Sequence, residues 1–115
     1  MVSHEKVAEL FVQGRKATGS RMFIEDGVIY SYGSHFPIAH KIGNNRVLFN
    51  TDKYSSSTSK HQSFVRRAIN SAGLEIIECT TKDIKNAIYG ESPIIILKEK
   101  YPEDLDTILE VLRDI

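Results

Sequence analysis

Two short stretches of the chain concentrate side chains that can do chemistry. The first, "YSYGSHFPIAH" at residues 30–40, places His35 among tyrosines and serines, and the second, "NTDKYSSSTSKH" at residues 50–61, ends with His61. Imidazole is the side chain that exchanges protons near pH 7, so two histidines brought together can act as acid and base. The packing of a small sheet does not require so many histidines, tyrosines and serines close together. The two stretches therefore predict a polar site.

Metal-independent cleavage of a phosphodiester is one chemistry that fits this set. His35 and His61 would share the acid and base roles, and Lys60 or a helix-start N–H group would stabilise the phosphate. Asp52 is the nearby carboxylate and no H-E-x-x-H pattern occurs, so we predict neither a metal nor a cofactor. A nucleophilic serine is disfavoured because "GSHF" does not extend to G-x-S-x-G.

Binding without cleavage is the competing interpretation, and we prefer it. A run of hydroxyl residues at 55–59 leads into a predicted helix, whose unpaired N–H groups and dipole favour anions. Basic side chains can contact phosphates, and tyrosines can stack on bases. The predicted ligand-binding residues are Tyr30, Ser31, Tyr32, Ser55, Thr58, Ser59, Lys60, Arg66 and Arg67, and Lys53 adds to the basic patch. The expected ligand is single-stranded nucleic acid or another phosphate-bearing molecule.

Structural roles for the same residues stay open as alternatives. The hydroxyl run can cap the helix, His61 can be a buried imidazole with satisfied hydrogen bonds, and the arginines can form a solvated helix face. His4 and His40 are expected at the surface. A third class of function also stays open, because an inhibitor or accessory protein that binds a host or viral protein by surface complementarity leaves no motif.

The apolar pattern of the first half predicts the elements that carry the site. "SHEKVAELFVQG", residues 3–14, predicts a helix, and "GRKATGS" predicts a loop. Asp26-Gly27 and the glycine-asparagine run at 43–45 predict two hairpin turns, so that the strands between residues 21 and 50 form an antiparallel meander. The interruption at 33–34 predicts a bulge or a tight turn.

A helix over residues 59–72 is predicted next. Ser59 and Gln62 match a capping box, and His61 precedes Phe64 and Val65 by three and four residues, so its side chain should point inward toward the sheet. The remaining expectations are a strand in "LEIIEC", a helix in "TKDIKNAIYG" capped by Thr80 or Thr81, a buried strand in "SPIIILK" and a closing helix in "YPEDLDTILEVLRDI". The fold class is α+β, with a mainly antiparallel sheet whose helices cover one face.

Length and composition limit the class of protein that this chain can be. The 115 residues predict a single domain, and 15 basic against 15 acidic residues leave no net charge, so a nucleic acid would have to be held by a local patch. The single cysteine, Cys79, indicates a reducing compartment. No apolar run approaches the roughly 20 residues of a membrane span. We expect a soluble cytoplasmic protein without a membrane partner, and the sequence does not set its oligomeric state.

The two polar stretches together resemble a pattern in small uncharacterised proteins of phages, plasmids and their prokaryotic hosts. In that pattern a Y-S-Y-G-x-H-F-P segment precedes a Y-S-x-[ST]-T-S-x-H segment, and the match covers roughly residues 20–67. The resemblance implies a mobile-element origin and carries over no catalytic role. The residues that match the motif are Tyr30, Ser31, Tyr32, Gly33, His35, Phe36, Pro37, Asn50, Tyr54, Ser55, Thr58, Ser59 and His61.

Overall fold

The structure, a computed structural model, describes residues 3–34, 36–43 and 45–89, and the structural statements below refer to these residues. Three predictions lie outside them. These are the catalytic role of His35, the buried strand in "SPIIILK" and the closing helix in "YPEDLDTILEVLRDI".

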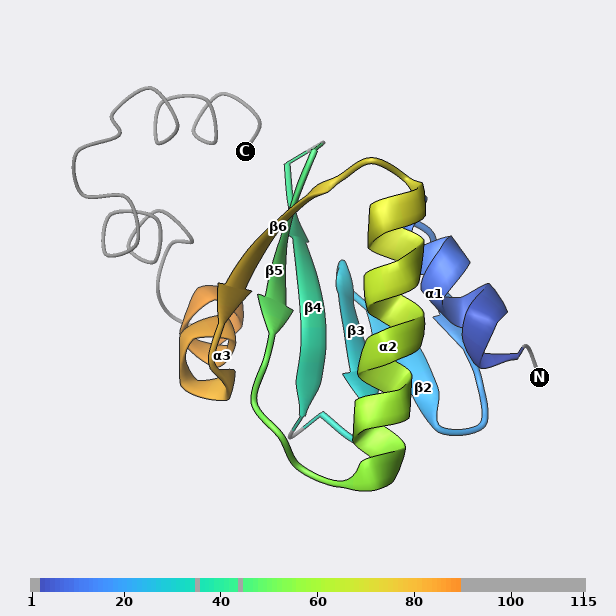
Figure 1. The fold of residues 1–115 in the computed structure, drawn as a ribbon, viewed down its shortest axis with the longest axis horizontal. Coiled ribbons are helices and arrows are strands. Elements are labelled where there is room, and N and C mark those ends of the chain that lie inside the picture. The colour runs from blue at the N-terminus through green and yellow to red at the C-terminus, as the bar shows by residue number, and fades with distance from the viewer. Residues whose placement is uncertain (1–2, 35, 44, 90–115) are drawn as a thin grey trace.

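The described chain folds into three helices and one sheet, as the α+β class predicts (Figure 1). The strands lie in chain order from β1 to β6; β1 to β5 pair antiparallel, whereas β5 and β6 are parallel. The elements are α1 (His4–Val12), β1 (Ala17–Thr18), β2 (Met22–Glu25), β3 (Val28–Ser31), β4 (Pro37–Ile42), β5 (Arg46–Asn50), α2 (Ser56–Ser71), β6 (Glu75–Cys79) and α3 (Thr81–Tyr89).

The predicted meander is confirmed. Asp26 and Gly27 have φ values of 51° and 77°, as a type I′ turn between β2 and β3 requires, and β4 and β5 form the second hairpin. The prediction of a plain loop at 14–20 is wrong at Ala17 and Thr18, which pair with β2 as β1. A strand of two residues is too short to show an alternating pattern, so it could not be predicted from hydrophobic periodicity.

The start of α2 also differs from its prediction. The helix begins at Ser56, and its N-cap is Ser55, whose Oγ accepts the N–H of Thr58 at 3.1 Å. Gln62 does not close a capping box with Ser59; its Nε2 donates to the carbonyls of Asn50 at 2.8 Å and Asp52 at 3.0 Å. Every residue from 55 to 59 can cap a helix, so bonds to the preceding loop select the starting point.

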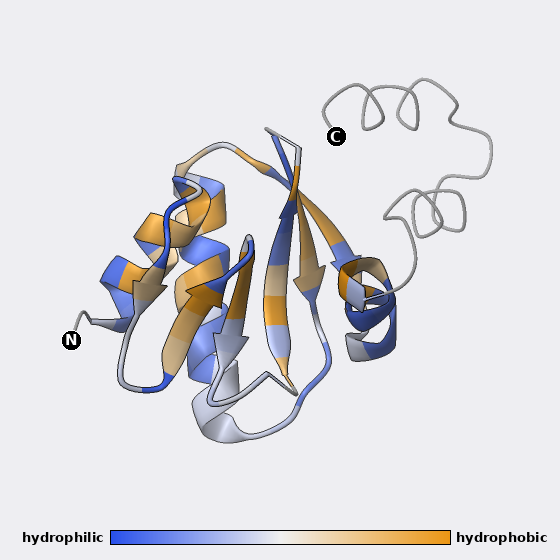
Figure 2. Ribbon diagram, turned by 180° about the vertical axis from the view of Figure 1, so that it is seen from behind, coloured by the Kyte–Doolittle hydropathy of each residue, from blue (hydrophilic) through white to orange (hydrophobic). Residues whose placement is uncertain are grey.

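Helices cover both faces of the sheet. On one face α1 and α2 enclose the main core, which includes Phe11, Phe49 and Val65. Leu48 points the other way because neighbouring strand residues alternate, and there it packs with Ile84 of α3. The expected arrangement on one face thus holds for α1 and α2, whereas α3 lies on the opposite side. Figure 2 shows hydrophobic residues concentrated along the strands between these layers.

None of the helices in the described part of the chain is long and apolar enough to cross a membrane.

Candidate functional site

A strained turn at the end of β3 sets the direction of Tyr32. The N–H of Gly33 donates to the carbonyl of Ser31 at 2.8 Å, and Tyr32 between them has a φ of 67°. These features define a γ-turn of the rare positive-φ kind, which is unfavourable for a residue with a Cβ atom. Strand alternation would point Tyr32 away from Ser31, yet its ring centroid lies 5.3 Å from that of His61 on the α2 side. The predicted tight turn is therefore present and re-aims a side chain.

A second irregularity lies opposite this turn. Ile29 pairs with Ala39 but Tyr30 pairs with Pro37, so Ile38 is an extra residue in β4. Such a bulge increases local twist and breaks the alternation of side chains. Ile38 and Ala39 consequently both join the core beneath α1 and α2.

The two motif segments meet in a buried polar cluster. His61, which is 3% exposed, points inward as predicted, and its Nδ1 lies 2.7 Å from Oγ of Ser31. The same Ser31 oxygen lies 3.2 Å from Oγ1 of Thr58, which accepts a hydrogen bond from Oγ of Ser55 at 3.1 Å. This chain of hydroxyl groups connects the N-cap of α2 to the end of β3. We call Ser31, Thr58 and His61 the serine–histidine cluster.

His4 and Arg21 border this cluster, although neither was among the predicted site residues. The ring of His4 meets that of His61 edge to face, with centroids 4.6 Å apart, and its buried Nε2 has no hydrogen-bond partner in the described part of the chain. The carbonyl of Arg21 accepts the N–H of Tyr32 at 2.7 Å, and its guanidinium lies 6.0 Å from the Tyr32 ring.

The surface position expected for His4 is wrong, since the side chain is half-buried between α1 and α2. Its spacing to Val7, Ala8 and Phe11 follows the apolar stripe of α1, and that signal could have placed it inward. His40, also expected at the surface, is half-buried as well, and burial lowers its pKa. Nothing in the sequence around Arg21 indicated its position.

The electrostatics keep His61 uncharged at neutral pH. Burial disfavours the imidazolium form, and the neighbouring His4 and Arg21 add repulsion, so the pKa of His61 falls to about 4. Near pH 7 the ring then carries no extra proton to donate. In a two-histidine cleavage mechanism, His61 would be restricted to the base role, and a base of such low pKa is weak.

Tyr30 does not join this cluster. It is 5% exposed, stacks on Phe23 with ring centroids 5.0 Å apart, and hydrogen-bonds Tyr89 of α3. Burial, that hydrogen bond and nearby carboxylates raise the pKa of its hydroxyl. The structure thus places Tyr30 on the α3 face of the sheet, whereas Ser31 and Tyr32 lie on the α2 side.

A separate cavity collects basic and hydroxyl groups on one side of α2. Its volume is about 220 Å³, and it is lined by Phe49, Thr51, Lys53, Ser59, Gln62, Ser63 and Arg66. Ser59, Ser63 and Arg66 share one helical face by their spacing. The guanidinium of Arg66 lies over the ring of Phe49, 4.5 Å from its centroid, which holds this charge at the cavity by a cation–π contact. We call this feature the Lys53–Arg66 cavity.

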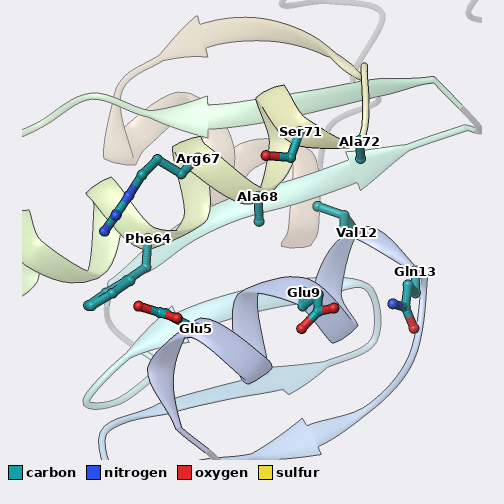
Figure 3. A pocket seen from close by; sticks show the side chains of 9 residues that line it. All are labelled: Glu5, Glu9, Val12, Gln13, Phe64, Arg67, Ala68, Ser71 and Ala72. Carbon is teal, nitrogen blue, oxygen red and sulfur yellow. The ribbon is translucent and has the colours of Figure 1, made fainter.

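Arg67 lies elsewhere, so the predicted basic patch is divided. Its guanidinium covers the ring of Phe64 at 5.0 Å, and it lines a groove between α1 and α2 together with Glu5 and Glu9 (Figure 3). Lys60 is exposed and lies two helical turns before Arg67, outside the lining of the Lys53–Arg66 cavity. Of the predicted phosphate-binding residues, Ser59 and Arg66 meet at that cavity.

The loop that carries Lys53 is fixed by hydrogen bonds that connect the end of β5 to β4 and to the start of α3. Asn50 is fully buried, and its Nδ2 donates to the Pro37 carbonyl and to Oγ1 of Thr81, both at 2.9 Å. Its Oδ1 accepts the N–H of Asp52, whose carboxylate accepts the N–H of Thr81 at 2.7 Å. Residues 51–55 therefore leave β5 in a defined direction. Tyr54, which is 62% exposed, follows Lys53 on this loop.

Comparisons of the chain with protein-family models, curated protein sequences and solved structures found no match. The resemblance of the two motif segments to a phage and plasmid family therefore stays a prediction. Among the described residues, no three histidine, cysteine or acidic side chains gather where they could hold a metal ion.

Proposed function

We propose that this chain is a binding protein for a phosphate-bearing ligand, and that single-stranded nucleic acid is the ligand class. The observation that carries this proposal is the Lys53–Arg66 cavity, where a lysine and an arginine converge with serine hydroxyls. Cationic and hydroxyl donors around one hollow are the groups that contact phosphate oxygens in nucleic-acid complexes. These basic groups would attract phosphate locally, although the chain as a whole has no net charge.

Exposed aromatic rings favour a single strand over a duplex. Tyr54 adjoins Lys53 on the loop before α2, and Tyr32, 45% exposed, lies above the first turns of the same helix. Rings held at the surface offer stacking platforms for unpaired bases, which a duplex does not present. The strand would run from the cavity past the start of α2, with Arg21 near its far end.

Binding is favoured over cleavage because of the state of His61. A neutral imidazole with a pKa of about 4 cannot supply an acid near pH 7, and Ser31, its hydrogen-bond partner, is buried. The serine–histidine cluster therefore serves this proposal by holding Tyr32 and the start of α2 together. Cytoplasmic location and mobile-element origin remain predictions that accompany the proposal.

Fluorescence anisotropy with labelled single-stranded RNA and DNA, at two salt concentrations, tests the proposal. Oligonucleotides of about six nucleotides fit one copy of the chain, so the oligomeric state does not enter the result. Arg66→Ala should weaken binding about tenfold and reduce its salt dependence, because one phosphate contact is lost. Arg67→Ala is the matched control, since its side chain lines the other groove, and it should change binding less than twofold.

Two results would overturn the proposal. One is an absence of binding by the wild-type chain at low salt, and the other is an equal loss in Arg66→Ala and Arg67→Ala. The same samples run on a denaturing gel report cleavage. Oligonucleotides that are shortened by the wild-type chain, but not by His61→Ala, would show that the chain is a nuclease and not only a binding protein.

A further inference from the structure

The groove between α1 and α2 carries apolar side chains of different size and charged side chains of both signs. Its volume is about 560 Å³, and it shares no lining residue with the Lys53–Arg66 cavity. In Figure 3, Glu5 and Phe64 lie at one end of the groove, Glu9 and Ala68 lie near its middle, and Ala72 lies at the other end. On the α2 wall, the large ring of Phe64 therefore marks one end and the methyl group of Ala72 marks the other.

The size gradient follows one ridge of α2. Phe64, Ala68 and Ala72 are spaced by four residues, and such i, i+4 ridges are the surfaces that interdigitate when helices pack. If a second α2 lies antiparallel across this ridge and is centred on Ala68, Phe64 of each copy meets Ala72 of the other. A bulky ring then fills the space that a methyl group leaves, and it does so twice.

The charged side chains of the groove would also pair between the two copies. Glu5 and Glu9 stand exposed on the α1 wall, and Arg67 stands exposed on the α2 wall. Glu9 has a long contact with Lys6 at 3.8 Å, whereas Arg67 forms no ion pair within the described residues. A two-fold axis through Ala68 would bring the acidic wall of each copy toward Arg67 of the other.

We propose that this groove is the interface of a homodimer, in which two copies of the chain pack through antiparallel α2 helices about a two-fold axis at Ala68. A symmetric interface presents the same patch twice, so the patch must complement itself in both shape and charge. The ridge of Phe64, Ala68 and Ala72 supplies the match in shape. The acidic α1 wall and Arg67 on the α2 wall supply the match in charge. The occupant of the groove is thus a second copy of this chain.

Sedimentation equilibrium over a range of protein concentrations tests the dimer directly. The wild-type chain should approach twice its mass of 13.0 kDa as concentration rises. Ala68→Glu should remain monomeric, because it places two carboxylates together at the axis. Asn70→Glu is the matched control: it adds the same charge to an exposed position of the same helix, outside the groove, and should leave association unchanged. Circular dichroism establishes that both variants fold.

Charge exchange supplies a second test that does not depend on folding of one variant. Arg67→Glu alone, and Glu5→Lys with Glu9→Lys, should each weaken association about tenfold or more, and the combination of all three should restore it. In addition, Ala68→Cys should form a disulfide-linked dimer under mild oxidation, whereas the native Cys79 is buried.

A wild-type mass that stays monomeric up to about 1 mM would overturn the dimer, since specific association is measurable by that concentration. A dimer that survives Ala68→Glu would also overturn it, because the copies would then meet through another surface. Nucleic-acid binding is measured with strands that need one copy, so failure of either proposal leaves the other standing.

Discussion

Nδ1 of His61 and Oγ of Ser31, thirty residues apart in the chain, lie 2.7 Å apart beneath the ring of Tyr32. This contact joins the end of β3 to the second turn of α2 and is buried from solvent. Because each atom would need another partner if the contact were lost, it fixes how the two motif segments sit against each other. The binding surface proposed above depends on that placement.

Removal of the Ser31 hydroxyl should destabilise the fold. Ser31→Ala leaves the buried Nδ1 of His61 without this partner, and we expect a loss of about 1–3 kcal/mol in the free energy of unfolding. Urea denaturation measures this loss. Ser34→Ala, an exposed serine three residues later, is the control and should stay within about 0.5 kcal/mol of wild type. Equal effects of the two changes would mean that the contact contributes nothing.

The low pKa of His61 predicts how stability changes with pH. In the unfolded chain this histidine takes up a proton near its usual pKa of 6.5, whereas in the folded chain it stays neutral down to about pH 4. Between these values the unfolded state binds more protons, so stability should fall as pH falls from 6.5 to 4, by at most roughly 3 kcal/mol. Denaturant unfolding at several pH values measures the slope.

His61→Asn separates this contribution from the other groups. Asparagine keeps a polar atom near the position of Nδ1 but does not titrate, so the pH slope between 6.5 and 4 should become smaller. Burial also lowers the pKa of His40, which contributes a residual slope of the same sign. An unchanged slope in His61→Asn would show that His61 is protonated in the folded chain above pH 5.

Much of the fold followed from the sequence because its signals are local. Asp26-Gly27 specifies a two-residue turn by its need for positive φ, and Thr80, one of the two residues expected to cap α3, exchanges hydrogen bonds with Asp83. The inward direction of His61 followed from its spacing to the apolar stripe of α2. Each of these signals involves residues within one turn of each other.

Features set by distant contacts could not be predicted in this way. The position of Arg21 beside His61 depends on how β2 pairs with β3, and the separation of Arg66 from Arg67 depends on which helix lies beside α2. Adjacent residues on a helix point about 100° apart, so a basic pair in the sequence need not form one patch. The two arginines were predicted to form one basic patch, whereas the packing of α2 places them at two different surfaces.

The strained backbone at Tyr32 predicts an unusual order of variant stabilities. A Cβ atom at positive φ costs about 1–2 kcal/mol, which glycine avoids. Tyr32→Gly should therefore be more stable than Tyr32→Ala by about 1 kcal/mol, although glycine is normally the less stabilising residue. Chemical unfolding measures the two stabilities, and an alanine variant as stable as the glycine variant would argue against strain.

The same two variants lose the exposed ring. They should therefore bind single strands more weakly than Tyr32→Phe, which keeps the ring.

The loop that carries Lys53 should depend on the amide of Asn50. Asn50→Asp keeps the size of the side chain but replaces the donor that serves the Pro37 carbonyl with an oxygen, so a buried acceptor faces an acceptor. We expect a loss of about 3 kcal/mol or more in the free energy of unfolding.

Asp52→Asn is the matched control, because it makes the opposite exchange of an acid for an amide. It retains an oxygen for the N–H of Thr81 and should lose less than about 1.5 kcal/mol, since only the charge on that hydrogen bond is removed. Thermal and urea unfolding of the two variants test this expectation. If Asn50→Asp is the milder change, the buried amide does not hold the loop, and its position is set by other contacts, among them the hydrogen bonds of Gln62 and Thr51.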